Sequence, residues 1–394
     1  MTRRLPLDGI VVADFSRVLA GPLCTQLLAD EGARVIKVEE PRGGDETRRW
    51  GPPFHGDTST YFLSVNRNKE SLALDLRSES GRALAHELIA RADVVVDNFL
   101  PAQRAALLDV PEDKIHCSIG GFDGDTSEAN TPGYDLLAQA GAGLMSITGA
   151  ADGEPAKIGV ALSDVLTAHY AHGAILAALV ARAKTGRGQR LEVSLFASTL
   201  ASLVNVAQGA LVTNNEARRY GNAHPSIVPY QLFHARDRQF AIGGGTDRHF
   251  RLLCERVIEK PELATDARFS TNRERVAHRD LLVPLLEEIF RTRDAAHWVA
   301  RCREAGVPAS VVQGVLEALR SEAAAALIAR VGDYDTVLHP VRFDGQRLPI
   351  RSAPPRLGEH TEALVHELSI RDDEQRETYG EDEADQRGHE TKVR

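Results

Sequence analysis

Residues 9–40 alternate between short apolar runs and one amphipathic run, an order that strongly limits the folds open to the chain. The run GIVVADF (9–15) is followed by a loop of small residues, SRVLAGP (16–22), a helical segment, LCTQLLADEG (23–32), and a second apolar run, ARVIKVEE (33–40). This strand, helix, strand order favours two parallel strands joined by a crossover helix. The alternation continues through SLALDL (71–76), a helix over 80–92, DVVVDNF (93–99) and KIHCSI (114–119). The sequence therefore predicts an α/β domain built on a parallel sheet.

Three loops directly follow predicted strands. They are SRVLAGP after the first strand, NFLP (98–101) after Val96, and GGFDGD (120–125) after Ile119. Ligands of parallel α/β sheets usually bind at the carboxyl ends of the strands. We therefore expect these loops to contribute to a binding site.

The chain divides into further segments by composition. A strand GQRLEVSLF (188–196) and a helical run to about Thr213 precede a turn-rich stretch, RRYGNAHPSIVPYQLF (218–233), which marks a domain boundary. We expect a large domain over 1–215, a smaller α/β domain over 220–318 and a return to the large domain over 325–370. Residues 371–394 are rich in acids and poor in apolar residues, which predicts a disordered acidic tail.

The overall charge limits the class of partner. The 394 residues carry a net charge of −9, so no general basic field is present to hold nucleic acid. The first apolar run stops at Asp14, too short for a signal peptide, and we expect no later run to reach the roughly 20 residues of a membrane span. We expect a cytoplasmic protein with small-molecule substrates and neither a nucleic-acid nor a membrane partner.

Cysteine and histidine spacing argues against a metal site. Cys24, Cys117, Cys254 and Cys302 lie far apart and form no CxxC pair, which predicts buried free thiols. Of the fourteen histidines, only His169 and His172 have a ligand-like spacing, and no third ligand is near them. The chain also lacks GxGxxG after the first strand, GxxxxGK[ST], HExxH and GxSxG, so the familiar cofactor and nucleophile motifs are absent.

The loop ITGAADGEPAKIG (147–159) places Asp152 between small residues. Gly149 and Gly153 allow close approach of a ligand, and the loop leads into VALSDVLTAHYAHGAILAALVARAKTG (160–186). That segment predicts a long helix with a cap signal at Ser163 and Asp164 and an end at Gly186. An aspartate before a glycine is most often only a turn residue. From the residues alone, both a turn and an exposed reactive carboxylate stay open.

Six segments taken together resemble the CoA-transferases of family III, the formyl-CoA transferase or carnitine type. They are DFSRVLAGPLCTQLLADEGARVIKVEEPRGGDETRRWGPP (14–53), SVNRNKESLALDL (64–76), VVVDNFLP (94–101), TPGYDLLAQAGAGLMSITGAADGEP (131–155), KTGRGQRLEVSL (184–195) and PPRLGEHT (354–361). The resemblance extends to about Ser369. Within the family, TRRWGPPFHGDTSTYFLSVNRNK (47–69) and the stretch 218–233 look most like the succinate:hydroxymethylglutarate, glutarate-type dicarboxylate members.

This resemblance implies a fold and an oligomer. The fold is a large Rossmann-like α/β domain formed by the N- and C-terminal parts, with a smaller α/β domain between them. The oligomer is a homodimer in which two ring-like chains are interlocked.

The resemblance also implies that Asp152 is the nucleophile. A carboxylate is ionised at neutral pH and can attack a thioester without a partner base. The implied substrates are an acyl-CoA and a free, probably dicarboxylic, acid, with CoA as part of the substrate and no tightly bound cofactor.

Contacts to CoA carry over from the family onto the strand-end loops. They are Leu19, Ala20, Leu74, Asp75, Leu76, Arg77, Asn98, Phe99, Leu100, Gly120, Gly121, Phe122 and Asp123. Phe122 is either a ring against CoA or a core aromatic. Two basic residues of the family pattern are replaced here by Glu40 and Ala106, which leaves Arg42, Arg77 and Arg104 as candidates for the CoA phosphates.

The acid substrate and a lid are implied by further positions. Arg48 and Arg49 beside Trp50 could hold a distal carboxylate, although exposed arginines are common. Gly243, Gly244 and Gly245 match a glycine loop that covers the active site in formyl-CoA transferase, or else form a plain turn.

Two rival functions share this fold. One is a non-catalytic CoA-binding protein, which would not need Asp152. The other is an α-methylacyl-CoA racemase, whose base pair is a histidine before the aspartate of a GHD motif and a second aspartate about thirty residues on. Here the motif reads Gly133-Tyr134-Asp135, followed by Asp164, and a tyrosine hydroxyl is a poor base at neutral pH. A transferase is therefore the expected function.

Overall fold

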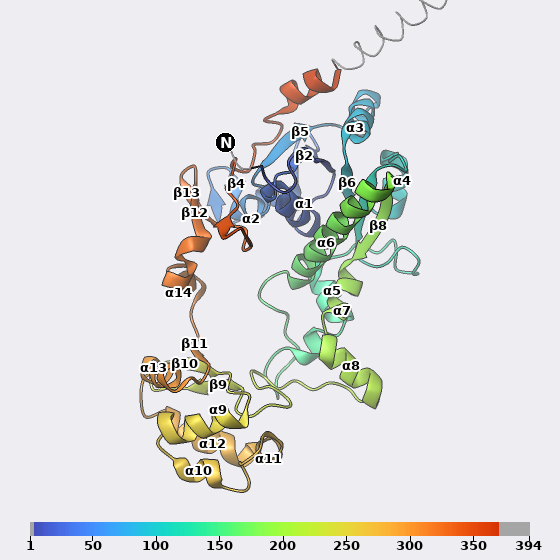
Figure 1. The fold of residues 1–394 in the computed structure, drawn as a ribbon. Coiled ribbons are helices and arrows are strands. Elements are labelled where there is room, and N and C mark those ends of the chain that lie inside the picture. The colour runs from blue at the N-terminus through green and yellow to red at the C-terminus, as the bar shows by residue number, and fades with distance from the viewer. Residues whose placement is uncertain (1–3, 370–394) are drawn as a thin grey trace, which may run out of the picture. The chain divides into compact units, whose positions relative to one another are not determined.

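The computed structural model describes residues 4–369, and the predicted acidic tail over 371–394 lies outside the described residues. The described chain forms two compact units (Figure 1). Unit 1 contains residues 4–144, 158–211 and 326–369, and unit 2 contains residues 145–157 and 212–325. Residues 145–157, predicted to belong to the large domain, thus group with unit 2.

Unit 1 is organised around a six-stranded parallel sheet, as the strand and helix alternation predicts. The strand order is β5-β2-β1-β6-β7-β8. The strands are β1 (Val11–Asp14), β2 (Arg34–Glu39), β5 (Lys69–Ala73), β6 (Val94–Asp97), β7 (Ile115–Gly120) and β8 (Gln189–Ser194). In the centre of the sheet, Val12 of β1 pairs with Val35 of β2 and with Val94 of β6. Because all pairings are parallel, the carboxyl ends of the strands share one edge.

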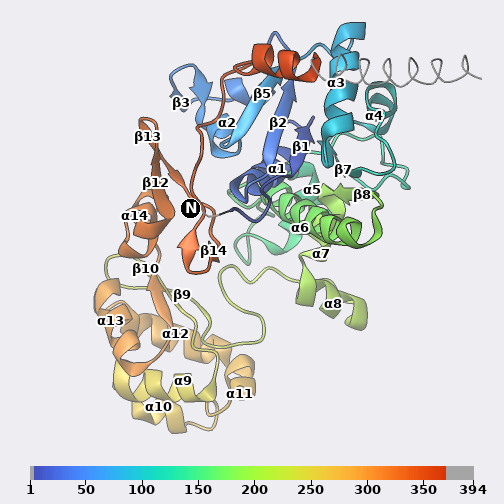
Figure 2. The same cartoon turned by 45° about the horizontal axis from the view of Figure 1, so that its top comes forward.

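Helices cover both faces of this sheet (Figure 2). Successive strand residues point to opposite faces, so Val94 and Val96 of β6 enter one buried cluster and Val95 enters the other. Helices α1, α5, α6 and α7 pack in the first cluster, and α3 packs in the second together with a helix over residues 361–369. The helices of unit 1 are α1 (Ala20–Asp30), α2 (Thr60–Ser64), α3 (Glu79–Arg91), α4 (Pro101–Leu107), α5 (Asp135–Gly141), α6 (Leu162–Thr185), α7 (Leu195–Ala201) and α8 (Val204–Thr213), whose last two residues belong to unit 2.

Helix α6 differs from its prediction at its start. It begins after Ala161 with no side-chain cap, so Ser163 and Asp164 lie within its first turn, where the Ser163 hydroxyl accepts a hydrogen bond from Thr199 (2.8 Å). It ends as predicted at Gly186, whose φ is +69°. By length and composition α6 could cross a membrane, which was not expected from the sequence. Its buried stripe of Ala168, Ala171, Ile175 and Ala178 packs in the core of unit 1.

The C-terminal segment returns to unit 1 beside the edge strand β5. The Ser71 N–H donates to His360 Nδ1 (3.2 Å), and the Ala73 N–H donates to Thr361 Oγ1 (2.9 Å). The hydrogen bonds give the edge strand partners that a further strand would otherwise supply. The smaller elements of unit 1 are η1 (Glu46–Arg49), β3 (Phe54–His55), β4 (Thr58–Ser59), β12 (Ile328–Val331), β13 (Tyr334–Val337), β14 (Arg342–Phe343) and β15 (Gln346–Arg347).

Unit 2 has its own sheet and its own core. Its antiparallel strands lie in the order β11-β10-β9, and the Phe290 ring packs edge-on against Phe233, Phe240 and Trp298. The elements are η2 (Met145–Ile147), β9 (Gln231–His234), β10 (Gln239–Ile242), α9 (Asp247–Leu252), η3 (Leu253–Val257), α10 (Pro261–Thr265), α11 (Asn272–Ala277), α12 (Arg279–Phe290), α13 (Ala295–Ala305), β11 (Ala309–Val311), α14 (Val315–Leu319) and η4 (Glu322–Leu327), which crosses into unit 1. The four cysteines of the chain are buried free thiols.

Candidate active site

A cavity of about 260 Å³ lies at the carboxyl edge of the sheet of unit 1. It is lined by the loops that follow β1, β6 and β7, by the end of β8, by the segment around Tyr134 and by Asp164 of α6. The position agrees with the rule that parallel sheets bind ligands at their carboxyl ends. The three loops singled out in the sequence are thus brought together.

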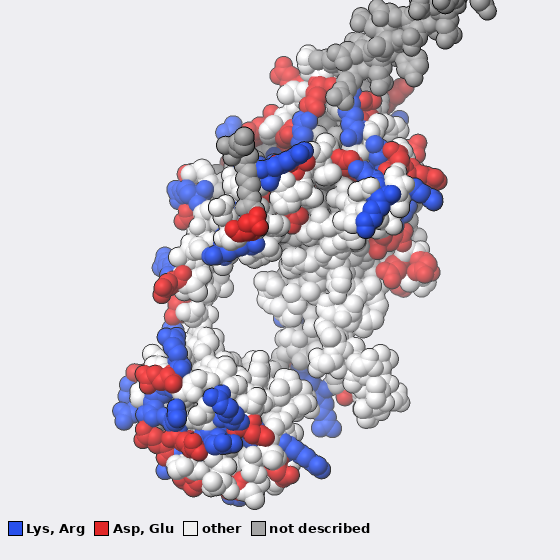
Figure 3. Space-filling model, in the orientation of Figure 1, with Lys and Arg blue, Asp and Glu red and all other residues white. Residues whose placement is uncertain are grey.

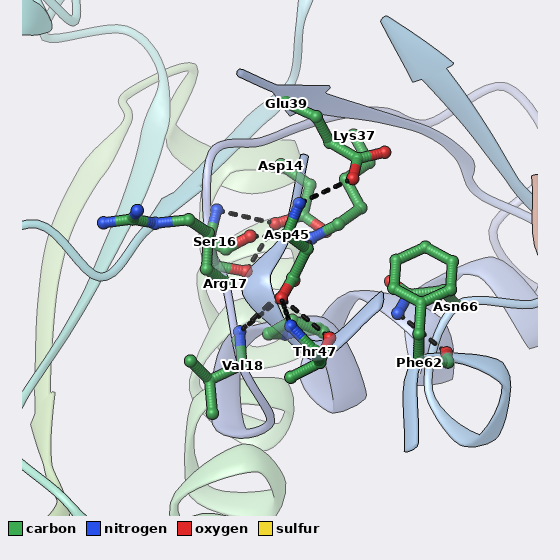
Figure 4. Close-up of polar contacts among 12 residues, drawn as sticks. Asp14, Ser16, Arg17, Val18, Lys37, Glu39, Asp45, Thr47, Phe62 and Asn66 are labelled. Atoms are coloured by element: carbon green, nitrogen blue, oxygen red, sulfur yellow. Dashed lines mark hydrogen bonds and ion pairs between the residues drawn. The ribbon is translucent and has the colours of Figure 1, made fainter. Parts of the chain in front are cut away.

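The loop after β1 is held by side chains (Figure 4). Asp14 Oδ1 accepts a hydrogen bond from Ser16 N (3.0 Å), and Lys37 Nζ donates to the Ser16 carbonyl (2.8 Å). Val18, whose φ is +73°, donates its N–H to the Asp45 carboxylate (3.2 Å). A β-branched residue rarely adopts this backbone conformation, so it requires such outside support.

The charges that hold this loop are buried and balanced. Lys37 pairs with Asp45 (3.0 Å), and Lys69 pairs with Asp14 (3.2 Å), with all four side chains fully buried. Burial raises the pKa of Asp14, but Lys69 and Lys37 outweigh it and hold that pKa below its ordinary value. Burial also lowers the pKa of Lys69 to about 8, against the pull of Asp14. Replacing one of these groups would leave its partner charged and unpaired in the core.

The loop after β6 is ordered by Asp97. Its carboxylate accepts hydrogen bonds from Phe99 N (3.0 Å) and Arg104 Nε (3.1 Å), and it pairs with His116 (2.7 Å). Burial alone would raise the pKa of Asp97, but His116 and Arg104 together lower it. Arg104 is therefore fixed in the cavity wall by an ion pair.

The loop after β7 approaches another backbone segment very closely. A Cβ atom on Gly121 would lie 2.6 Å from the Gly133 Cα atom, so neither position has room for a side chain. Phe122 lines the cavity and also stacks on Phe196, with ring centroids 5.5 Å apart. Asp123 accepts a hydrogen bond from the Ser194 hydroxyl (2.6 Å).

Two carboxyl groups, Asp135 and Asp164, also line the cavity. Asp135 accepts hydrogen bonds from Ser163 N (2.9 Å) and Gln139 Nε2 (2.9 Å). Burial and the charge of Asp135 raise the pKa of Asp164 to about 7, although the Ala20 N–H donates to Asp164 and opposes the shift. Asp164 is thus a titrating group near neutral pH in the cavity wall.

Asp152 lies in unit 2, in a tight turn that exposes its side chain. The turn is closed by a hydrogen bond from Gly153 N to the Ala150 carbonyl (3.1 Å). Within residues 4–369, no hydrogen bond or ion pair involves the Asp152 carboxylate. It lines an open hollow of unit 2 together with Arg218, Arg219 and Tyr220.

Arg219 ties the Asp152 loop together. Its guanidinium donates to three carbonyls of this loop, those of Ser146 (2.9 Å), Ala150 (3.3 Å) and Gly153 (2.7 Å). These contacts lie within unit 2 and link residues 145–157 to the rest of that unit. Arg219 is not among the predicted site residues, although it lies in the stretch 218–233 that carries the family resemblance.

The predicted CoA contacts fall into two groups. Those that line the cavity are Ala20, Asn98, Phe99, Leu100, Arg104, Gly120, Gly121, Phe122 and Asp123, together with Tyr134. Leu19 and the run Leu74, Asp75, Leu76 and Arg77 do not line it. Leu74 is buried in the core, and Arg77 forms an exposed pair with Asp75 (3.1 Å). One cation that lines the cavity, Arg17, was not predicted.

The role expected for Arg48 does not fit its surroundings. Its guanidinium makes a buried two-point pair with Glu39 and lies 3.7 Å from the centre of the Phe62 ring. A third nitrogen donates to the Pro355 carbonyl (3.1 Å). Arg48 is therefore committed to the core, whereas Arg49 and Trp50 are exposed.

Gly243, Gly244 and Gly245 follow β10 in unit 2. The Gly243 N–H donates to the Pro308 carbonyl (2.9 Å), and the Gly245 N–H donates to the Gly243 carbonyl (2.9 Å). Side chains at these positions would meet only ordinary van der Waals contacts.

Among the described residues, no cluster of three or more His, Cys, Asp or Glu side chains is placed to hold a metal ion.

Comparison with known proteins identifies the family. The model of CoA-transferase family III matches residues 7–361. The succinyl-CoA:glutarate CoA-transferase of Mus musculus is 38% identical over 381 residues, which cover 92% of this chain and 86% of that protein. The acetyl-CoA:oxalate CoA-transferase of Acetobacter aceti is 39% identical over 375 residues, which cover 92% and 96% of the two chains.

A solved structure agrees with these relatives. A CAIB/BAIF family protein from Brucella suis has a TM-score of 0.85 at 39% identity, covering 93% of this chain and 100% of that one. The resemblance to glutarate-type members seen in the sequence is confirmed by the named relatives. The chain belongs to CoA-transferase family III.

Proposed function

We propose that this CoA-transferase moves CoA from an acyl-CoA to a free dicarboxylic acid through a covalent intermediate on Asp152. The observation that carries the proposal is the exposed Asp152 carboxylate, held in a turn that Arg219 braces and engaged by no other side chain of the described residues. A solvated carboxylate without a partner is available as a nucleophile. A turn residue with no further role would need no such brace.

The first half-reaction releases the donor acid. An Asp152 oxygen attacks the thioester carbon, the C–S bond breaks, and a mixed anhydride and CoA thiolate form. The thiolate then attacks the Asp152 carbonyl carbon, and the donor carboxylate leaves with the electron pair of the broken C–O bond. The product is an aspartyl-CoA thioester, and no proton or external electron is required.

The second half-reaction repeats these steps in reverse. The acceptor carboxylate attacks the aspartyl thioester and expels CoA thiolate, which then attacks the acceptor carbon of the new anhydride. Asp152 is regenerated as a carboxylate. One thioester is consumed and one is made, so the overall free-energy change is small and the reaction runs in both directions.

Two relatives support a dicarboxylic acceptor, because their names pair succinyl-CoA with glutarate and acetyl-CoA with oxalate. Arg48 is committed to Glu39, so another cation must meet the distal carboxylate. Arg218 is exposed, lines the same hollow of unit 2 as Asp152, and forms no ion pair within the described residues. An arginine can bind a carboxylate through two parallel hydrogen bonds. We assign the distal carboxylate to Arg218.

An acceptor panel tests this function. With succinyl-CoA as donor, glutarate and oxalate should outcompete acetate and propionate in kcat/KM. Arg218→Gln should raise KM for the dicarboxylates roughly ten- to a hundredfold and leave the weak turnover of monocarboxylates unchanged. Preference for monocarboxylates in the unaltered enzyme would refute the proposed acceptor class.

We also propose a homodimer, which the family resemblance implies in interlocked form. Large apolar side chains are exposed on α5, α6 and α7 of unit 1, including Leu136, Leu137, Tyr170, Val180 and Leu200. Figure 3 shows the surface over α5 and α6 as nearly free of charged side chains. Exposed apolar side chains that gather on one face often mark a surface covered by a partner. Sedimentation should give twice the mass of one chain, and a stable folded monomer would contradict the proposal.

A further inference from the structure

The backbone of Ser16 to Val18 is held almost entirely by side chains from elsewhere in unit 1. Asp14 and Lys37 hold Ser16, and Asp45 holds Val18. Between them, Asn98 binds both backbone polar groups of Arg17. The Arg17 N–H donates to Asn98 Oδ1 (3.0 Å), and Asn98 Nδ2 donates to the Arg17 carbonyl (2.8 Å). Both polar atoms of the Asn98 amide thus hold the Arg17 backbone.

The Arg17 side chain is the part of this loop that is left unengaged. It is exposed, lines the cavity and points away from the buried charges beneath the loop (Figure 4). No ion pair to Arg17 is found within residues 4–369. The other arginine of the cavity wall, Arg104, is paired with Asp97.

Most of the charged side chains in the cavity wall are acidic, so its two arginines are the groups that could attract an anionic ligand. Its wall also carries five carboxyl groups, those of Glu46, Asp123, Asp135, Asp164 and Glu192. An anionic ligand would be repelled over most of this surface and attracted only near a cation. The candidates Arg42 and Arg77 do not line the cavity, and Arg77 is already paired with Asp75.

We propose that Arg17 anchors the phosphates of CoA and that Asn98 and Asp45 are positioning residues that present it. The proposal rests on the proposed function, because it takes CoA as the ligand. Asn98 fixes the backbone of Arg17 itself, and Asp45 fixes the next residue in a conformation that Val18 would not adopt alone. A preorganised arginine loses less entropy when it binds a phosphate than a mobile one.

Binding of free CoA, measured by calorimetry without any acyl donor or turnover, tests the anchor. Arg17→Gln should weaken CoA binding roughly ten- to a hundredfold and should reduce the salt dependence of binding. The affinity of Arg17→Lys should lie between those of the unaltered protein and Arg17→Gln. The same variants should bind pantetheine, which has no phosphate, as well as the unaltered protein does. Comparing CoA with 3′-dephospho-CoA distinguishes the 3′-phosphate from the diphosphate as the group bound.

Double variants test the positioning role. Asn98→Ser should weaken CoA binding in the Arg17 protein and add little in the Arg17→Gln protein, because its effect passes through Arg17. Asp45→Asn serves as a second positioning variant where it folds. The matched control is Asp30→Asn, which disrupts another buried pair of unit 1, with Arg67 (2.6 Å), away from this loop, and should leave the CoA dissociation constant unchanged.

Three results would overturn the proposal. They are unchanged CoA binding by Arg17→Gln, an equal loss for pantetheine, and full additivity of Asn98→Ser with Arg17→Gln. A protein that binds CoA through Arg17 but transfers it to no dicarboxylic acid would refute the proposed function and leave this inference standing.

Discussion

The Arg48 guanidinium donates two hydrogen bonds to the Glu39 carboxylate, from Nε (2.8 Å) and from Nη2 (2.7 Å), and both side chains are buried. Burial would raise the pKa of Glu39, but the hydrogen bonds from Arg48 and the charge of Lys37 hold it below its ordinary value. Glu39 also accepts from the Asp45 N–H (3.0 Å). The pair therefore supports the same segment that holds the loop after β1.

Removing Arg48 should destabilise the protein rather than change its acceptor preference. Arg48→Gln leaves Glu39 buried without its partner charge, which costs about 3–5 kcal/mol of unfolding free energy. Urea denaturation measures this loss, and Arg49→Gln is the exposed control, expected within about 0.5 kcal/mol of the unaltered protein. Unchanged stability together with a lost dicarboxylate preference would show that Arg48 binds substrate.

Asp164 should make stability depend on pH. Its pKa is raised by burial and by Asp135 to about 7, above the value of 3.8 in an unfolded chain. Between pH 4 and 7 the folded state therefore binds more protons than the unfolded state, so this group contributes stability at low pH that is lost as pH rises through 7. The loss is on the order of 4 kcal/mol at most.

The variant Asp164→Asn removes this titration. Unfolding free energies at pH 5 and pH 8 should show that the variant gains stability relative to the unaltered protein as pH rises. Any packing change caused by the amide acts equally at both pH values and therefore cancels in this comparison. Parallel pH profiles of the two proteins would contradict the raised pKa.

Arg219 should matter for turnover more than for binding. Arg219→Ala frees the carbonyls of Ala150 and Gly153 on either side of Asp152 and leaves the nucleophile mobile. We expect kcat to fall roughly tenfold or more, with little change in KM for acyl-CoA, because misplacement of a reacting group acts on the chemical step. Arg219→Lys should recover part of the loss.

The control for Arg219 is Arg301→Ala. Arg301 also donates to a backbone carbonyl in unit 2, that of Arg256, and pairs with Glu259 (2.8 Å), but it does not contact the Asp152 loop. The kcat of the Arg301→Ala variant should match that of the unaltered enzyme. An equal loss of kcat in both variants would reduce the role of Arg219 to general stability of unit 2.

The parallel sheet could be predicted from the sequence because its signal is local. Runs such as DVVVDNF alternate with amphipathic segments, and each run contains a strand of the sheet, although β8, at the edge, is mostly exposed. The three binding loops followed from the same pattern, since the ends of parallel strands meet at one edge. These steps need only the order of the elements.

Side-chain partners could not be predicted in this way. Arg48 and Arg49 are adjacent and chemically alike, yet one is buried against Glu39 and the other is exposed. The three carbonyls bound by Arg219 lie 66 to 73 residues from it in the chain. Such contacts depend on tertiary packing, which neither periodicity nor spacing encodes.

Trapping the covalent intermediate tests the central claim most directly. The enzyme is incubated with succinyl-CoA and hydroxylamine, which cleaves an aspartyl thioester or anhydride and leaves a hydroxamate on the reacting aspartate. Peptide mass spectrometry should find this modification on Asp152, dependent on the acyl-CoA and absent when Asp152→Asn is treated alike. An enzyme that turns over under these conditions with Asp152 unmodified, or with the hydroxamate on another residue, would contradict the account.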